Sequence, residues 1–361
     1  MSLLKKCIGL DPNIRKPLDI GLIWEGNYWD DKDVHDCCDV DWETCEILVR
    51  KIAKALVLPT SPIDNGGIEN KKILIFLPKV MQLPLTILAA YRVGLIGIVM
   101  DPLVSKNKVL EKIIMCEKPR IVVTVDAVWQ AQELIEIKSK VENICGMDES
   151  QLLVIRHVAP NHGIPPPKKH YPARRPSYRT TLDLRNGKDW EWSTIMAEIK
   201  MEMNPKIEDS EFNWENEDIV MKLVDEKGKA HPVSKAELLE SLESRKLGLE
   251  TRVLDKYHEN HVAFENVLVL DAPQDLETIV NLLLPWYMGK TLTLFEGPLN
   301  YPDSSRLAQI ISKHNVDIVL GSDYNYSIPN PEYLKLFPVP SLKLVDLPNF
   351  ESISNYLTIS R

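Results

Sequence analysis

The chain has 361 residues, of which 44% are hydrophobic and 26% charged, as in an ordinary soluble globular protein with one or two buried cores. Its formal net charge of −9 argues against nucleic acid as a partner, because phosphate binding requires clustered Lys and Arg. Six cysteines in a chain of this length do not indicate a disulfide framework.

No secretion signal is recognisable in the first residues, and the most apolar stretch, Ile73 to Met100, is interrupted by Lys79 and Arg92. A membrane span needs about 20 apolar residues without such charges, so we interpret this stretch as buried strand and helix. We therefore expect a cytoplasmic protein without a membrane span, with the nucleus as the alternative compartment. An interaction with a protein partner stays open, because no residue identifies one.

The first half of the chain alternates short apolar runs with segments of helical periodicity. The apolar runs lack polar alternation, as strands buried on both faces should. Strand, helix and strand in regular succession predict a parallel α/β sheet with right-handed crossovers. The expected strands are 72–77, 95–100, 120–124 and 152–154, and the expected helices are 41–56, 81–94 and 106–116.

The segment from Ile164 to Arg179 has a different composition, rich in proline and basic residues and without an apolar period. We expect an exposed or disordered loop, and a positive surface that contacts a partner is the alternative. The α/β pattern then resumes. The expected strands are 218–224, 266–270, 291–295 and 316–320, and the expected helices are 234–244, 276–289 (broken by Pro285) and 304–314.

The most specific motifs lie between Gly289 and Leu320. A strand ends in Phe295-Glu296-Gly297, and then come Tyr301-Pro302-Asp303, Arg306 and Lys313-His314-Asn315-Val316. This order resembles the acetyl-CoA synthetase pattern of the AMP-forming acid–CoA ligases, which are adenylate-forming enzymes. The IWEG of residues 23–26 and the stretch 73–126 also resemble that pattern. The resemblance covers most of residues 20 to 350, and the basic segment matches least.

The resemblance implies an α/β fold of two packed subdomains with mainly parallel sheets flanked by helices, as in the N-terminal domain of adenylate-forming ligases. Residues 1–204 would form the first subdomain, with a basic Pro-rich insertion near 160–180. Residues 205–265 would hold a crossover and the phosphate-loop region, and residues 266–361 a second, truncated subdomain.

The family holds the phosphates of ATP in a Gly-rich loop that reads roughly Y-T-S-G-S-T-G-K-P-K-G. The corresponding segment here, 225–234, reads DEKGKAHPVS, with one glycine and no run of hydroxyls. Asp225 and Glu226 would repel phosphate. Lys227, Gly228 and Lys229 are candidate cofactor-binding remnants of the loop, but a plain strand-to-helix turn is the favoured interpretation.

Other family motifs are altered or lie beyond this sequence. The A-D-x-G-W-x-x-G segment appears as residues 270–275 without its tryptophan and glycines, and G-E-P aligns with 347–349. The sequence ends before Y-G-x-T-E and before the lid with the catalytic lysine, so we assign no catalytic residue. Packing, turns and capping explain the motif residues that remain. These are Glu296, Gly297, Tyr301, Pro302, Asp303, Arg306, Lys313 and His314.

Several other residues are of types that act in acid–base catalysis or metal binding. Asp271 and Asp275 could act as an acid–base pair only if a pocket raises the pKa of one of them. The spacing of Cys37, Cys38 and Cys45 near His35 matches no zinc-binding pair, so we expect reduced thiols and no metal. The histidines at 231, 258 and 261 are interpreted as surface residues.

Two hypotheses follow. The first is a non-catalytic homologue that acts in binding or scaffolding and needs no cofactor. The second is a fragment or atypical form of an active acid–CoA ligase, which would use ATP, magnesium and CoA to form an acyl adenylate and then a thioester.

Overall fold

The computed structural model describes eleven parts of the chain. They are residues 2–11, 13–28, 36–57, 71–144, 150–158, 182, 184–200, 211–257, 263–322, 337 and 342–346, without the side chains of 255–257. The expectations for Ile164 to Arg179, for His35, His258 and His261, and for residues 347–349 lie outside these ranges.

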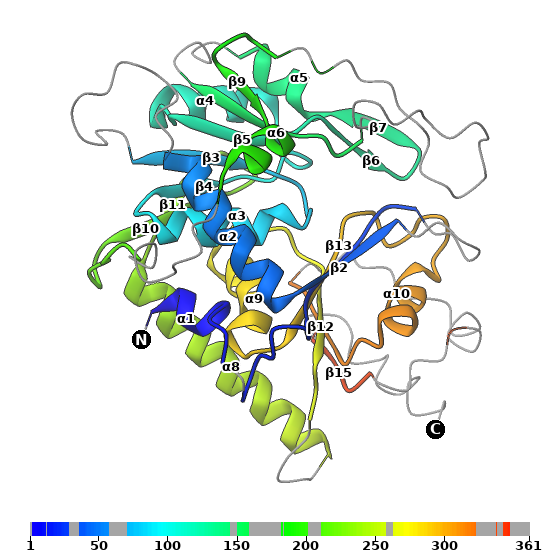
Figure 1. The fold of residues 1–361 in the computed structure, drawn as a ribbon. Coiled ribbons are helices and arrows are strands. Elements are labelled where there is room, and N and C mark those ends of the chain that lie inside the picture. Colours follow the sequence, from blue (N-terminus) through cyan, green and yellow to red (C-terminus); the bar gives the residue numbers. More distant parts are fainter. Residues whose placement is uncertain are drawn as a thin grey trace.

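The larger of two main sheets has seven strands, which are parallel except for the pair β10–β11. Figure 1 shows it in the upper half of the molecule. Its order is β11 (Ala230–Ser234), β10 (Ile219–Val224), β4 (Ile96–Val99), β3 (Lys72–Phe76), β5 (Ile121–Val125), β8 (Gln151–Ile155) and β9 (Asp189–Glu191).

The smaller main sheet has six strands and lies below the larger one in Figure 1. It is also parallel, except for the pair β1–β2. Its order is β15 (Leu344–Asp346), β14 (Ile318–Leu320), β12 (Asn266–Val269), β13 (Thr291–Phe295), β1 (Ile20–Glu25) and β2 (Cys37–Asp41). A separate hairpin consists of β6 (Ala127–Gln130) and β7 (Glu133–Glu136).

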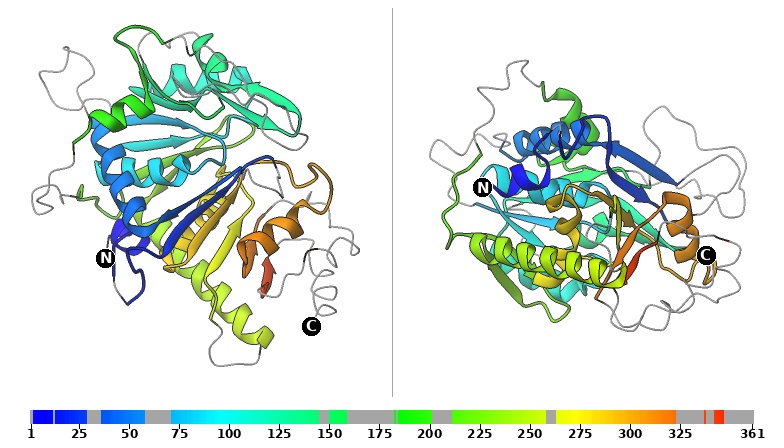
Figure 2. Two further views of the ribbon diagram at one scale, coloured as in Figure 1. Left: turned by 45° about the vertical axis from the view of Figure 1, so that its right-hand side comes forward. Right: turned by 90° about the horizontal axis from the view of Figure 1, so that it is seen from below.

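Helices flank both sheets, and one continuous apolar core runs from one sheet to the other. Figure 2 shows the two sheets side by side, with the long helix α8 across the lower part of the molecule. The helices are α1 (Leu3–Cys7), α2 (Trp42–Val57), α3 (Gln82–Arg92), α4 (Asn107–Glu117), α5 (Ile137–Glu142), α6 (Trp192–Glu198), α8 (Lys235–Tyr257), α9 (Leu276–Tyr287) and α10 (Arg306–His314). Among the described helices, none is both long and apolar enough to cross a lipid bilayer.

The expected fold class is confirmed. The runs at Ile73–Phe76 and Leu292–Leu294 are buried strands in different sheets, as expected. The helix 276–289 was expected to break at Pro285, but α9 continues to Tyr287. Pro285 lies in the last turn of α9, where its missing N–H costs only one hydrogen bond and the helix ends soon afterwards.

The expected division at residues 204 and 265 does not follow the sheets. β1 and β2, from the first 41 residues, pair with each other, and β1 pairs with β13 in the smaller sheet. β10 and β11, from the expected crossover, complete the edge of the larger sheet. Local pattern identifies a strand, but the choice between two apolar sheets depends on contacts between residues far apart in the sequence.

Candidate functional site

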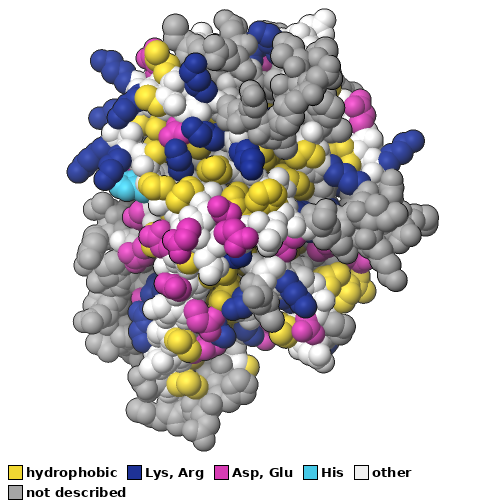
Figure 3. All heavy atoms as spheres, turned by 90° about the vertical axis from the view of Figure 1, so that its left-hand side faces the viewer, with side chains coloured by type: hydrophobic (Ala, Val, Ile, Leu, Met, Phe, Trp, Pro, Cys, Tyr) yellow, Lys and Arg dark blue, Asp and Glu magenta, His cyan; other side chains and the backbone are white. Residues whose placement is uncertain are grey.

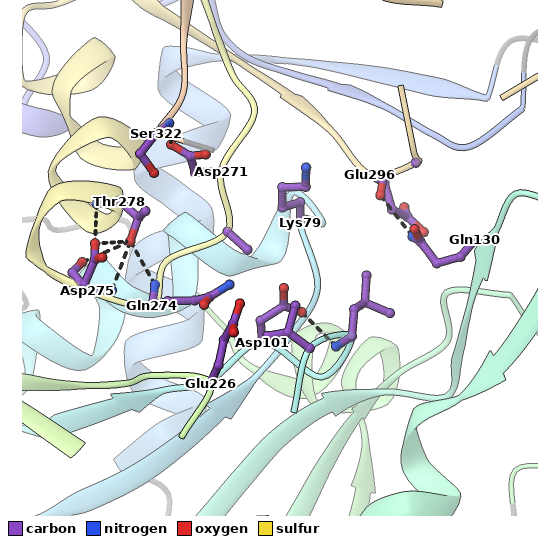
Figure 4. A pocket seen from close by; sticks show the side chains of 14 residues that line it. Lys79, Asp101, Gln130, Glu226, Asp271, Gln274, Asp275, Thr278, Glu296 and Ser322 are labelled. Carbon is purple, nitrogen blue, oxygen red and sulfur yellow. Dashed lines mark hydrogen bonds between the residues drawn. The ribbon is translucent and has the colours of Figure 1, made fainter. Parts of the chain in front are cut away.

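A cavity of about 460 Å³ lies between the two main sheets. Its lining comes from the loops that follow β3, β4 and β10 of the larger sheet and β12, β13 and β14 of the smaller one (Figure 4). The start of α9 and the β6–β7 hairpin complete it. In open α/β sheets, ligands bind at the carboxyl ends of the strands, so this cavity is the candidate site.

The lining of the cavity is strongly acidic. One lysine faces five carboxylic acids, a formal charge of −4 when all are ionised. Figure 3 shows that the charge of the chain is also uneven on one outer face, with Lys and Arg gathered over the upper half and carboxylates below. The charged residues of the cavity are Lys79, Asp101, Glu226, Asp271, Asp275 and Glu296.

Lys79, the single lysine of this lining, also joins the two sheets. It follows β3, and its Nζ donates a hydrogen bond of 2.5 Å to the carbonyl oxygen of Leu270, which follows β12. Burial lowers the pKa of Lys79, although the charges of Asp101, Asp271 and Glu296 oppose that effect. The ammonium group therefore gives one of its three N–H donors to the protein backbone.

Asp101 is one of the buried carboxylates of this lining. Its side chain is 6% exposed and lines the cavity, and Oδ1 accepts a hydrogen bond of 2.9 Å from the amide of Leu103. Oδ2 accepts none from the described residues. Burial raises the pKa of Asp101, partly offset by the Leu103 amide and by Lys79 and Lys140.

The structure brings Asp271 and Asp275 to the same cavity, as an acid–base pair would require. Asp271 accepts a 2.7 Å hydrogen bond from the amide of Ser322. Asp275 caps α9 in a capping box with Thr278, whose amide donates to Oδ1 at 2.9 Å. Glu296 is 2% exposed and lies 2.8 Å from Nε2 of His157.

Residues 225–229 form the turn of a β-hairpin between β10 and β11, not the expected strand-to-helix turn. The three candidate remnants Lys227, Gly228 and Lys229 all donate their amides to Asp225. Two donate to its carboxylate Oδ1, both at 2.9 Å, and the amide of Gly228 donates to its backbone oxygen. His231 holds the other carboxylate oxygen at 2.9 Å, and these hydrogen bonds lower the pKa of Asp225.

The motifs IWEG and K-H-x-V, almost 290 residues apart, meet at Glu25. This carboxylate and Arg306 are both fully buried and lie 2.9 Å apart. Lys313 and His314 hold the second oxygen of Glu25 at 2.7 and 2.8 Å. Burial alone would raise the pKa of Glu25, but the His314 hydrogen bond and the charges of Arg306 and Lys313 lower it.

The other motif residues lie around the same corner of the smaller sheet. Asp303 Oδ1 accepts a hydrogen bond of 2.8 Å from the amide of Ser305, just before α10. Tyr301, which precedes Pro302 through a cis peptide bond, packs edge-on against Tyr28. A Cβ at Gly297 would lie 2.9 Å from Asn27 Oδ1, so this glycine permits the close approach of two strand ends.

Sequence reasoning did not single out Lys79, Asp101 or Glu226 as members of one site. Each lies within three residues of the end of an expected strand. Charged residues directly after buried parallel strands are the signal that could have found them, because such strand ends share one edge of a sheet.

No family model matches the chain. It is similar to the chloroplastic/glyoxysomal acetyl-coenzyme A synthetase of Arabidopsis thaliana, with 24% identity over 318 residues, which is 86% of this chain and 38% of that protein. The acetyl-coenzyme A synthetase of Syntrophus aciditrophicus is 22% identical over 306 residues, 83% of this chain and 40% of that protein. The chain thus spans well under half the length of these relatives.

Among solved structures, the acetoacetyl-CoA synthetase from Streptomyces lividans matches 99% of this chain and 50% of its own, with a TM-score of 0.67 and 14% identity. A structural match at 14% sequence identity establishes the fold alone. The chain therefore has the fold of an AMP-forming acid–CoA ligase, as the sequence motifs predict.

Proposed function

We propose that this chain is a non-catalytic relative of the acetyl-CoA synthetases that acts by binding, with its cavity open to a ligand other than ATP. One observation carries the proposal. In the hairpin turn that corresponds to the phosphate loop, Asp225 accepts the amides of all three candidate phosphate contacts.

An anion bound by such a loop needs free amides that point at it. Here the carboxylate of Asp225 takes the place that a phosphate would need, and Glu226 adds a second negative charge on the cavity side. Hydrogen bonds to a charged group contribute about 1.5–3 kcal/mol each. The loss of three such bonds would weaken a micromolar site by more than a thousandfold.

The motif residues fit a structural role within this proposal. Arg306, Lys313 and His314 contact the buried Glu25, and the Asp303 carboxylate accepts a hydrogen bond from the backbone ahead of α10. None of these four side chains lines the cavity. They would therefore persist in a chain that keeps the fold without adenylation.

The test is a titration of the chain with ATP and magnesium, together with acid-dependent exchange of pyrophosphate into ATP. We expect no thermal shift at millimolar nucleotide and no exchange. A shift that disappears in Lys227→Ala or Lys229→Ala, but persists in the exposed control Lys108→Ala, would contradict the proposal.

That contrary result would favour the alternative, a fragment or atypical form of an active acid–CoA ligase. The similarity to acetyl-CoA synthetases supports this alternative. It would require Asp225 to release the loop amides when nucleotide binds. Exchange of pyrophosphate that depends on the added acid would identify the acyl substrate class.

A further inference from the structure

We propose that Lys79 binds a carbonyl compound covalently, as an imine between its amine and a neutral aldehyde in the cavity between the sheets. The inference rests on the proposed function, since it names the ligand class of the same cavity. The primary observation is the position of the amine. Among the described residues, Lys79 is the one lysine of the cavity lining, and no carboxylate forms an ion pair with it.

The surroundings of Lys79 favour the uncharged amine, which is the form that attacks a carbonyl carbon. An ammonium group taken out of water is costly unless an ion pair replaces its hydration. Burial therefore lowers the pKa of Lys79, although the charges of Asp101, Asp271 and Glu296 oppose that effect. At neutral pH, a larger share of Lys79 is consequently uncharged than of an exposed lysine.

The hydrogen bond of Lys79 to the backbone leaves its lone pair available. Nζ donates to the carbonyl oxygen of Leu270 at 2.5 Å. A neutral amine has two N–H groups and one lone pair, so this bond orients the nitrogen and uses only one N–H. Figure 4 shows Lys79 among the labelled carboxyl groups of Asp101, Asp271 and Glu296, which follow strands of both sheets.

Imine formation needs only the aldehyde and a group that moves protons. The lone pair of Nζ attacks the carbonyl carbon, and the electron pair of the C=O bond moves to the oxygen. Both hydrogens of the amine pass to that oxygen, first to give a carbinolamine and then to release water as the C=N bond forms. Asp101 suits this proton transfer, because its charge acts on Lys79 more strongly than those of Asp271 and Glu296. Burial also raises the pKa of Asp101, which keeps it protonated to higher pH.

The lining of the cavity restricts the kind of aldehyde. The carboxylates of Asp101, Glu226 and Asp271 repel an aldehyde that carries a phosphate or carboxylate group. Leu103 and Ala272 offer apolar surface to an alkyl chain. The volume of about 460 Å³ falls in the range of small-molecule pockets. A neutral aliphatic aldehyde of a few carbons fits these properties.

The experiment treats the whole chain with butanal and sodium cyanoborohydride at pH 7. The hydride reduces an imine to a stable N-butyl amine, and peptide mass mapping gives the rate at each lysine. We expect labelling of Lys79 at least about threefold faster than labelling of the exposed Lys108, because more of Lys79 is neutral amine. Between pH 7 and 9, the rate at Lys79 should rise less steeply than the rate at Lys108.

Variants separate the nucleophile from the proton transfer. Lys79→Arg keeps a positive charge without the nucleophile and should lose the adduct, whereas the control Lys108→Arg should leave the rate at position 79 unchanged. Asp101→Asn should slow labelling of Lys79 about tenfold or more. Loss of the Asp101 charge alone would favour the neutral amine and speed the attack, so slower labelling reports proton transfer.

The inference is overturned if Lys108 is labelled as fast as Lys79, or if the two rates rise equally with pH. A wild-type rate in Asp101→Asn would overturn the assigned proton transfer. A parallel titration with ATP and magnesium separates the two proposals. A thermal shift there would overturn the proposed function itself, whereas labelling of exposed lysines alone, without a shift, would overturn only the carbonyl ligand.

Discussion

At the scale of single residues, Glu25 and its partners Arg306, Lys313 and His314 form a buried polar cluster. Glu25 and Arg306 have fully buried side chains, and Arg306 also donates to the carbonyl of Gly26 at 2.9 Å. Such a cluster ties β1 to both ends of α10. Removing one member leaves the others buried without their partner. The cost of that unpaired buried charge exceeds the net contribution of the ion pair to stability.

We therefore predict that Glu25→Gln lowers the free energy of unfolding by about 3–5 kcal/mol at pH 7. The pKa of Glu25 is lowered below its ordinary value of 4.5 in the folded chain. Its stabilising effect is therefore complete above pH 4.5 and is lost as the pH falls through the lower folded pKa. Below pH 4.5, urea unfolding should therefore show a smaller difference in the free energy of unfolding between Glu25→Gln and the wild type.

The control for this prediction is Glu265→Gln, whose side chain is 75% exposed and lies 3.2 Å from Lys290. It should cost well under about 1 kcal/mol, because water screens an exposed ion pair. Equal losses in the two variants would refute a special role for the buried cluster.

At the scale of elements, the hairpin β10–β11 packs against α4 through Gly228. This glycine has a φ of +75°, and a Cβ there would lie 2.7 Å from Cγ1 of Val109. Lys112 also donates to the Gly228 carbonyl at 3.4 Å. The turn residue thus serves two purposes, a left-handed backbone and a close approach to the helix.

We predict that Gly228→Ala destabilises the chain more than Gly187→Ala. Gly187 has the same backbone conformation, with φ +73°, but a Cβ added there would meet no atom within 4 Å. Both changes carry the left-handed penalty of about 1–2 kcal/mol, and only the first adds a clash. Chemical unfolding measures the difference, and Val109→Ala should restore part of it in the Gly228→Ala background.

At the scale of the whole molecule, the hairpin β6–β7 joins the larger sheet to the end of β1. Asn27 is 1% exposed, and its side chain makes two hydrogen bonds with the backbone of Ala131, at 2.8 and 2.9 Å. Gln130 donates to the carbonyl of Glu296 at 3.1 Å. These contacts and the Lys79 bond to Leu270 hold the two sheets together beside the cavity.

Asn27→Ala should therefore cost about 1–3 kcal/mol of unfolding free energy, because a buried amide and a carbonyl lose their partner. Gln130→Ala removes one hydrogen bond of a half-buried side chain and should cost about 1 kcal/mol or less. If the two variants unfold at the same denaturant concentration, the Asn27 contact is not the stronger link between the sheets.

The sequence by itself determined the fold class and the position of most strands and helices. An unbroken apolar run such as 73–76 is typical of a strand that is buried on both faces, in a parallel sheet covered by helices. Four of the motif residues, Asp303, Arg306, Lys313 and His314, contact Glu25 or the backbone at one corner of the smaller sheet, which links the motifs to this fold.

Only the tertiary structure decided which strands share a sheet and which side chains share the cavity. β1 pairs with β13, far away in the sequence, and Lys79 meets Asp271 only because the carboxyl ends of two sheets face each other. Such neighbours leave no local period in the sequence, since each strand carries the same apolar pattern whichever sheet it joins. The hairpin turn whose amides bind the Asp225 carboxylate likewise depends on β11, and Pro232 within β11 is a residue that disfavours a strand locally.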